Sequence, residues 1–207
     1  MKKNKPGKIL IISSPSGGGK TSICRKLLSA KRKKDGWSFS ISCTTRKKRI
    51  GEQNGREYLF VNDEKFNHLI KKNYFAEHFK VHLYHYGTPR KNITDTLKKG
   101  GVLLLDIDVQ GALKIKKEYP EAITVFILPP SKEALRQRLT ARGTETKEQL
   151  KIRFENAKKE MKLFNKFEYT VINDEVKSAV EQVLSIINCH ECRSELIGKE
   201  QIKKIIG

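Results

Sequence analysis

The sequence has no apolar run of the roughly 18 residues that a membrane-spanning helix requires. Its N-terminal segment, MKKNKPGKILIISS, starts with basic residues, but its apolar run, ILII, is shorter than the core of a signal peptide. We therefore expect a cytoplasmic protein with no membrane partner, in which residues 8–13 form the first β-strand.

Cysteine is scarce as well. The four cysteines, Cys24, Cys43, Cys189 and Cys192, do not make a spaced disulfide framework, which favours a reducing compartment. Cys189 and Cys192 form a single C-x-x-C, and this supplies only half of the four ligands of a structural zinc site. A metal would need further ligands from elsewhere, so we assign this pair no function.

Acidic residues are few relative to basic ones. Lys and Arg total 43 against 23 Asp and Glu, and the net charge of +20 makes nucleic acid the first partner to consider. The lysines, however, are spread along the whole chain. The aromatic residues, 8% of the total, do not alternate with basic clusters as they do on base-stacking surfaces. We therefore predict that nucleic acid is not the partner despite the charge.

The sequence does contain an alternation of apolar strands and helical segments. Continuous apolar runs such as 101–108 and 122–128 are typical of strands buried on both faces of a parallel sheet. This rhythm breaks between about 42 and 92. The expected strands are 8–13, 37–43, 101–108, 122–128 and 169–173, and the last two helices are expected at about 146–164 and 175–188. The pattern predicts an α/β fold with a doubly wound parallel sheet in residues 1–41 and 93–188, a small inserted domain in 42–92, and a tail, 189–207, of unknown role.

A glycine-rich loop, SSPSGGGKTS (13–22), follows the first strand and precedes a helix. It matches the phosphate-loop pattern G-x-x-x-x-G-K-[ST], with Ser14 where the first glycine belongs. Gly17 and Gly19 have the most demanding backbone positions, because there the N–H groups must curl around a phosphate. Lys20 would bring positive charge to the β- and γ-phosphates, and Thr21 a hydroxyl to Mg²⁺. We predict a P-loop NTPase-type core that binds ATP through Ser14, Pro15, Ser16, Gly17, Gly18, Gly19, Lys20, Thr21 and Ser22.

Two carboxylates, Asp106 and Asp108, end the apolar run 101–108. A carboxylate at the tip of a buried strand is suited to holding Mg²⁺ or its waters beside a phosphate loop. Without the loop, both would be interpreted as strand-end caps. With it, we predict that Thr21 and Asp106 bind the metal.

Six separated motifs, in order, resemble those of the guanylate kinases. Besides the phosphate loop they are SISCTTRKKRIGEQNGREYLFV, FAEHFKVHLYHYGTP, LLLDIDVQGA, RLTARGTET and VIND, so the resemblance covers roughly residues 8–188. It implies an ATP:GMP phosphotransferase that uses Mg²⁺ and recycles GMP in purine nucleotide metabolism. It also implies that the insertion at 42–92 binds GMP and that about 131–164 form a helical lid.

The resemblance also implies which residues hold GMP, and their chemistry is suitable. Arg46 and Arg49 offer planar forks to a dianionic phosphate. Guanine presents N1–H and an amine, both donors, so the carboxylate of Glu77 is the natural acceptor, and the Thr88 hydroxyl can address O6. The predicted GMP-binding residues are Ser42, Arg46, Arg49, Tyr58, Glu77, Tyr86, Gly87, Thr88, and one or both of Asp106 and Asp108.

The lid contributes arginines in the same comparison. Arg142 and Arg153 would join Lys20 and Arg46 as the catalytic residues that stabilise the transferring phosphoryl group. Arg138 and Asn173 would bind ATP, the latter at the edge of adenine. Because the acceptor phosphate is already ionised, direct in-line transfer needs no general base.

Some features depart from the family, and other functions stay open. The acceptor loop carries Lys47, Lys48 and Ile50, where guanylate kinases usually have prolines between and after the two arginines, and the loss of prolines loosens a loop. The alternatives are a guanylate-kinase-like module that reads phosphopeptides, a nucleic-acid binder, and a kinase with another nucleotide acceptor. The sequence leaves the choice between a monomer and a homodimer open.

Overall fold

The structure is a computed structural model, and it describes residues 7–30, 36–81, 83–141, 147–196 and 199–206. The strands are β1 (Lys8–Ser13), β2 (Trp37–Phe39), β3 (Ser42–Thr44), β4 (Tyr58–Phe60), β5 (Phe75–Val81), β6 (Tyr84–Pro89), β7 (Val102–Asp106), β8 (Ile123–Leu128) and β9 (Tyr169–Ile172). The α-helices are α1 (Lys20–Ala30), α2 (Asp63–Lys71), α3 (Arg90–Lys98), α4 (Val109–Glu118), α5 (Lys132–Thr140), α6 (Lys147–Met161), α7 (Val176–Glu191) and α8 (Lys199–Ile206). Two short 3-10 helices are η2 (Phe164–Lys166) and η3 (Ser194–Leu196).

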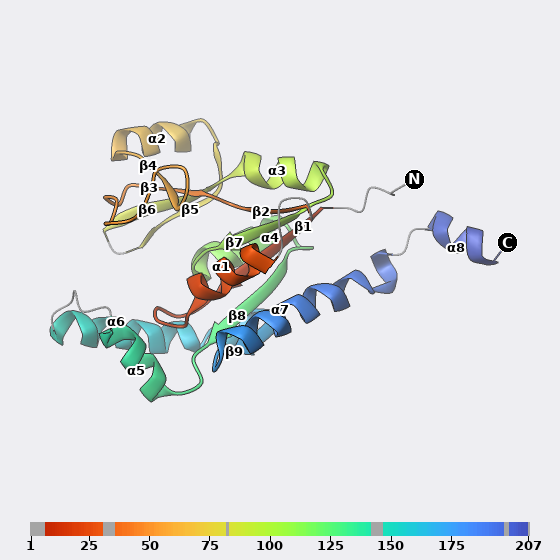
Figure 1. Cartoon of the computed structure of the whole chain (residues 1–207). Coiled ribbons are helices and arrows are strands. Elements are labelled where there is room, and N and C mark those ends of the chain that lie inside the picture. Colours follow the sequence, from red (N-terminus) through yellow and green to blue (C-terminus); the bar gives the residue numbers. More distant parts are fainter. Residues whose placement is uncertain (1–6, 31–35, 82, 142–146, 197–198, 207) are drawn as a thin grey trace.

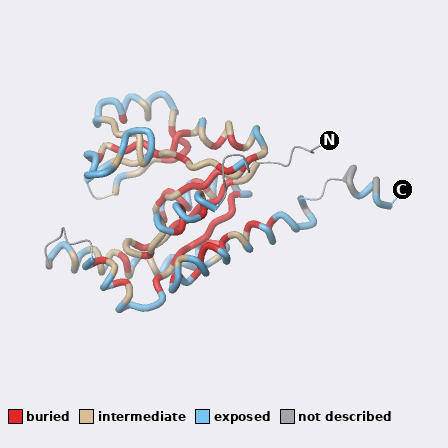
Figure 2. The backbone as a smooth tube through the Cα atoms, viewed as in Figure 1, coloured by how far each residue is buried: buried red, intermediate tan, exposed pale blue. Residues whose placement is uncertain are grey.

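The core is a five-stranded parallel sheet in the order β2-β7-β1-β8-β9 (Figure 1). Its central strands are buried along almost their whole length, because helices cover both faces (Figure 2). Helices α1 and α7 pack on one face, and α3 and α4 on the other. This is the doubly wound α/β architecture that the apolar runs predicted.

The strand order brings two chemically important chain segments together. In the pairing of β1 with β7, Ile12 lies opposite Asp106. Strand β1 ends at Ser13, so the phosphate loop begins beside the carboxyl end of β7. Ligands of open α/β sheets bind at this edge.

A second sheet, in the order β4-β3-β6-β5, lies beside the core, with α2 packed against it (Figure 1). The prediction of one strand over 37–43 was wrong. Ser40 donates the last hydrogen bond toward the core, to the Leu104 carbonyl at 2.9 Å, and the chain then enters the second sheet with β3. One sequence run therefore serves two sheets. The division into a core and an insertion at 42–92 stays a prediction.

Helices α5 and α6 pack on each other around a small core of Leu135, Leu139 and Ala157. Their connection, 142–146, lies outside the described residues. Helix α7 runs to Glu191, past the predicted end at 188, and so includes Cys189. No helix in the described part of the chain is long and apolar enough to cross a membrane.

Candidate active site

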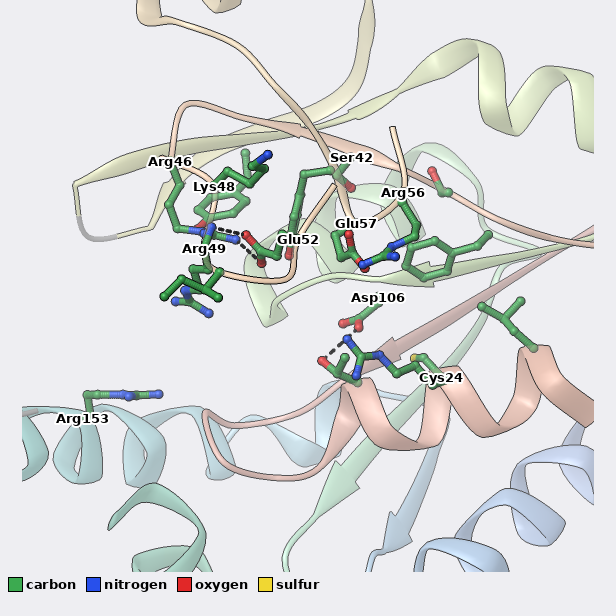
Figure 3. Close-up of a pocket in the computed structure, with 18 residues that line it drawn as sticks. Cys24, Ser42, Arg46, Lys48, Arg49, Glu52, Arg56, Glu57, Asp106 and Arg153 are labelled. Atoms are coloured by element: carbon green, nitrogen blue, oxygen red, sulfur yellow. Dashed lines mark hydrogen bonds and ion pairs between the residues drawn. The ribbon is translucent and has the colours of Figure 1, made fainter. Parts of the chain in front are cut away.

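A cavity of about 1020 Å³ lies between the end of the core sheet, the second sheet and helix α6 (Figure 3). It is strongly cationic: Arg25, Arg46, Lys48, Arg49, Arg56 and Arg153 line it, against the carboxylates of Glu52, Glu57 and Asp106. Arg153 comes from α6, on the opposite side from Arg46 and Arg49 (Figure 3). Such a cavity is suited to phosphate groups that several parts of the chain approach together.

The phosphate loop has the backbone that the sequence predicted. Gly17 and Gly19 have φ of +86° and +93°, in the left-handed region that favours glycine. Ser14 does not, because Asn73 is the single non-glycine residue with positive φ in the described part of the chain. A serine at the first position of the pattern is therefore compatible with the loop.

Lys20, Thr21 and Asp106 meet at the mouth of this loop. The Lys20 ammonium lies 2.8 Å from Asp106 Oδ1 and donates to the Ile107 carbonyl at 2.7 Å. Thr21 Oγ1 donates to Asp106 Oδ2 at 3.3 Å (dashed in Figure 3). Burial lowers the pKa of Lys20, but Asp106 more than offsets this, and the pKa lies above its usual value. Lys20 is therefore fully charged at neutral pH.

Asn173 and Arg138 secure the loop from the other side. Asn173 Nδ2 donates to the Gly18 carbonyl at 3.0 Å, and Arg138 Nη2 donates to the Asn173 carbonyl at 2.8 Å. Asn173 is buried, and its Oδ1 has no hydrogen-bond partner. The two predicted ATP-binding residues thus touch each other and the loop. The remaining predicted loop residues, Pro15, Ser16 and Ser22, lie within it or at the start of α1.

The loop between β3 and β4, residues 45–57, carries Arg46 and Arg49. Arg46 is 8% exposed, and its guanidinium lies over the Tyr58 ring at 5.5 Å from the ring centre. Glu52 accepts from Arg46 Nη2 at 2.7 Å and from the Arg49 backbone N–H at 2.8 Å. These contacts hold the pKa of Glu52 below its usual value, with the Arg46 hydrogen bond as the largest cause.

Sequence reasoning missed Glu52. It lies within the quoted motif SISCTTRKKRIGEQNGREYLFV, and its spacing of three and six residues from the two arginines was the available signal. Ser42, Tyr58 and Tyr86 join the arginines on the cavity wall. Ser42 and Tyr58 are register partners across β3 and β4, so the sheet brings them together.

Glu77 lies deeper, on β5. It is 1% exposed, and Thr88 Oγ1 of the neighbouring strand donates to its Oε1 at 2.6 Å. Its Oε2 has no partner. Burial, with a smaller contribution from the charge of Asp108, raises the pKa of Glu77 to about 7. Such an orphaned carboxylate oxygen is a strong acceptor awaiting a donor.

Asp108 and Asp106 have different structural roles. It caps helix α4 by accepting from the Gly111 N–H at 2.8 Å, and burial raises its pKa. Asp106, but not Asp108, Glu77 or Thr88, lies on the wall of the large cavity. Gly87, between Tyr86 and Thr88, is buried under the Phe75 ring, where a Cβ would meet ring carbons at 2.7–2.9 Å.

Of the two predicted lid arginines, Arg153 lies within the described residues. Arg153 Nη2 donates to Ser16 Oγ at 2.8 Å. Arg142 lies outside the described residues. A further contact was not predicted: Glu160, also on α6, accepts from the Ser16 backbone N–H at 3.0 Å. Cys189 and Cys192 are exposed, and the described residues contain no group of three or more His, Cys, Asp or Glu that could hold a metal ion.

Comparison with known proteins points to the same family as the sequence motifs. The family model described as "Guanylate kinase" matches residues 6–190. The chain is 46% identical to the guanylate kinase of Clostridium tetani, with 95% of each chain covered, and 40% identical to that of Thermotoga maritima, covering 90% of this chain and 89% of the relative. A crystal structure of guanylate kinase from Anaplasma phagocytophilum superposes with a TM-score of 0.77 at 31% identity, covering 92% of this chain and 89% of that one.

Proposed function

The chain belongs to the guanylate kinase family and is an ATP:GMP phosphotransferase, and we propose that the cationic cavity is where the γ-phosphoryl group of ATP passes to GMP. ATP binds at the phosphate loop. Lys20 lies at its mouth, and Arg138 and Asn173 support it from behind. GMP binds on the side of the cavity formed by the second sheet. The two phosphates then meet between the β3–β4 loop and α6.

The acceptor phosphate is held by the residues that line the second-sheet side of the cavity. Arg46 and Arg49 give it planar, charged donors, and Ser42, Tyr58 and Tyr86 give hydroxyls. The guanine base lies toward Glu77, whose orphaned Oε2 accepts from the N1–H and amine edge. Thr88 fixes the other oxygen of that carboxylate and so turns Oε2 toward the base.

Mg²⁺ fits the oxygen donors at the mouth of the phosphate loop. The Thr21 hydroxyl and the Asp106 carboxylate are hard ligands already in contact at 3.3 Å. When bound there with the ATP phosphates, the ion neutralises charge on the transferring group. Lys20 adds a fixed positive charge, and Arg153 adds another from the lid.

Catalysis by this chain is positioning and charge stabilisation. The phosphate loop, Arg46 and Arg153 bring donor and acceptor into line, and closure of α5 and α6 excludes water. Arg142 is proposed as a second lid cation on the strength of the sequence resemblance. We further propose a cytoplasmic enzyme of purine nucleotide metabolism that recycles GMP, as a monomer or a homodimer, with no nucleic-acid partner.

One observation carries the proposal: Thr21 and Asp106 line the same cavity as Arg46, Arg49 and Tyr58. A coupled assay of ADP release with Mg-ATP, comparing GMP, AMP, UMP and CMP, tests it, with Lys20→Ala as the control. Turnover with GMP alone that disappears in Lys20→Ala is expected, as is its loss when EDTA removes Mg²⁺. Turnover with another nucleotide would reassign the acceptor. No turnover at all, with salt-sensitive binding of RNA or binding of a phosphopeptide, would favour a binding role instead.

A further inference from the structure

Helix α6 holds the phosphate loop at one residue, Ser16, by two side chains. Glu160 Oε2 accepts from the Ser16 backbone N–H at 3.0 Å, and Arg153 Nη2 donates to the Ser16 hydroxyl at 2.8 Å. All three residues are partly buried. The acidic contact uses a backbone donor, whose direction is fixed by the loop, whereas the Arg153 contact uses a hydroxyl that can rotate.

The two side chains lie on the same face of α6. Arg153 and Glu160 are seven residues apart, which is within about 20° of two full turns and about 10 Å along the axis. A hydrogen bond at Glu160 therefore fixes the rotation of the helix that carries Arg153. It also limits how far that face can turn away from the phosphate loop.

A second contact attaches the helix pair to the loop. A Cβ built on Gly17 would lie 3.1 Å from the side chains of Leu135 and Leu139, the core residues of α5 on which α6 packs. The loop thus touches the helix pair through an apolar contact next to the Glu160 hydrogen bond. The apolar contact sets the distance between the elements, and the directional hydrogen bond sets the rotation of α6.

We propose that Glu160 is a positioning residue for phosphoryl transfer: by holding the Ser16 N–H it aims Arg153 at the reacting phosphate. This inference rests on the proposed function, since Arg153 must act on the transferring group. In the structure Arg153 donates to the Ser16 hydroxyl, beside the loop that takes the ATP phosphates. Arg153 exchanges this hydroxyl for a phosphate oxygen during turnover, while Glu160 keeps its contact.

Two substitutions of Glu160 separate its role as a hydrogen-bond acceptor from its negative charge. A carboxylate beside a triphosphate site costs ATP affinity, so its charge is not what the loop needs. Glu160→Gln keeps an acceptor oxygen for the Ser16 N–H and removes the charge. Glu160→Ala removes both. Glu155 is an exposed glutamate of the same helix, paired with Lys158, so Glu155→Ala is a matched control for loss of one charge on α6.

Steady-state ADP release by the full-length chain gives kcat and both KM values for each variant. We expect Glu160→Ala to lower kcat by about tenfold to a hundredfold, the effect of misplacing a catalytic group by about 1 Å, with the KM for GMP nearly unchanged. Glu160→Gln should retain kcat within about threefold and bind ATP no more weakly. Glu155→Ala should match the wild type. Thermal unfolding of each variant shows that the fold is retained.

A double-mutant cycle decides whether Glu160 works through Arg153. If it does, adding Glu160→Ala to Arg153→Ala changes kcat by less than about twofold, because the aimed group is already gone. Equal losses in the presence and absence of Arg153 would overturn the proposal, as would a wild-type kcat in Glu160→Ala. A wild type that does not phosphorylate GMP would instead overturn the proposed function, so the two failures are distinguishable.

Discussion

The Thr88 hydroxyl donates a 2.6 Å hydrogen bond to Oε1 of Glu77, and the other oxygen of this buried carboxylate has no partner. Without guanine beside it, burial favours the protonated form of Glu77, and the pKa rises from 4.5 to about 7. When guanine binds there as proposed, the donors on its edge favour the ionised form. Under this proposal Glu77 links pH to both folding and GMP binding.

Glu77 makes the GMP-free protein less stable as pH rises. Between about pH 4.5 and 7 the folded chain holds the Glu77 proton and the unfolded chain has lost it, so the free energy of unfolding falls with pH. The full difference is at most roughly 3–4 kcal/mol, for the rise of the pKa from 4.5 to about 7 at 1.36 kcal/mol per pKa unit. Glu77→Gln cannot ionise. We expect it to gain stability relative to wild type between pH 5 and pH 8, measured by urea unfolding.

The exposed Glu64 of α2 offers a control, since Glu64→Gln should follow the wild-type pH profile. A constant difference between Glu77→Gln and wild type across this range would contradict the raised pKa. Saturating GMP should reduce the pH dependence of the wild type, because the base supplies donors to the ionised carboxylate.

Glu52 orders the loop between β3 and β4 through contacts with both of its predicted GMP-binding arginines. It bonds the side chain of Arg46 and the backbone of Arg49, so its loss frees both ends of the contact. We expect Glu52→Ala to raise the KM for GMP by about tenfold, in line with one charge-assisted hydrogen bond, while the KM for ATP stays unchanged. Tighter GMP binding would show instead that Glu52 competes with the phosphate for Arg46.

The sequence predicted much of this fold because its signals are local. The apolar run of β7 and the glycines at 17 and 19 reflect constraints that adjacent residues impose on one another. The split of 37–43 between two sheets was not predictable this way, because Ser40 and Ser42 look alike in a strand pattern. Only the position of β7 decides which serine still bonds to the core.

The candidate site divides in the same manner. The motifs singled out the arginines and Glu77 as candidates through chemical need and family resemblance, and the structure adds what those residues contact. Glu52 was given no role although its spacing from Arg46 and Arg49 was a signal, and Glu160 was missed because a glutamate in a charged, lysine-rich helix has no distinguishing neighbours in sequence. The role of Glu52 depends on its contact with Arg46, and that of Glu160 on its contact with Ser16, which lies 144 residues before Glu160 in the chain.

Gly19 tests the geometry of the phosphate loop. Its φ is +93°, and a Cβ there would lie 2.1 Å from Asn173 Nδ2. Gly19→Ala therefore adds left-handed strain of about 1–2 kcal/mol and displaces Asn173, which bonds the same loop. We expect loss of ATP binding, measured by calorimetry with a non-hydrolysable analogue.

Gly36 separates strain from the clash. Its φ is +79°, but a Cβ would make an ordinary contact at 3.6 Å with Gly101, far from the phosphate loop. Gly36→Ala should lower stability by the same 1–2 kcal/mol or so and leave ATP binding intact. If Gly19→Ala binds the analogue as wild type does, the loop does not hold the phosphates in the conformation described.

Asp106 has two partners, the ammonium of Lys20 and the hydroxyl of Thr21, and each implies a different result. If its role is to hold Mg²⁺, Asp106→Asn should raise the Mg²⁺ concentration for half-maximal turnover by about tenfold or more, since the amide is a weaker ligand. If its role is only to place Lys20, kcat should fall with no change in the Mg²⁺ requirement. Asp95, a half-buried carboxylate paired with Lys91 on α3, supplies the control Asp95→Asn, which should alter neither quantity. Because Asp106 lies opposite Ile12 at the end of the β1–β7 pair, we expect the first result: in the proposed site the ATP phosphates lie at that edge of the sheet, where phosphate oxygens and Asp106 can bind the same metal ion.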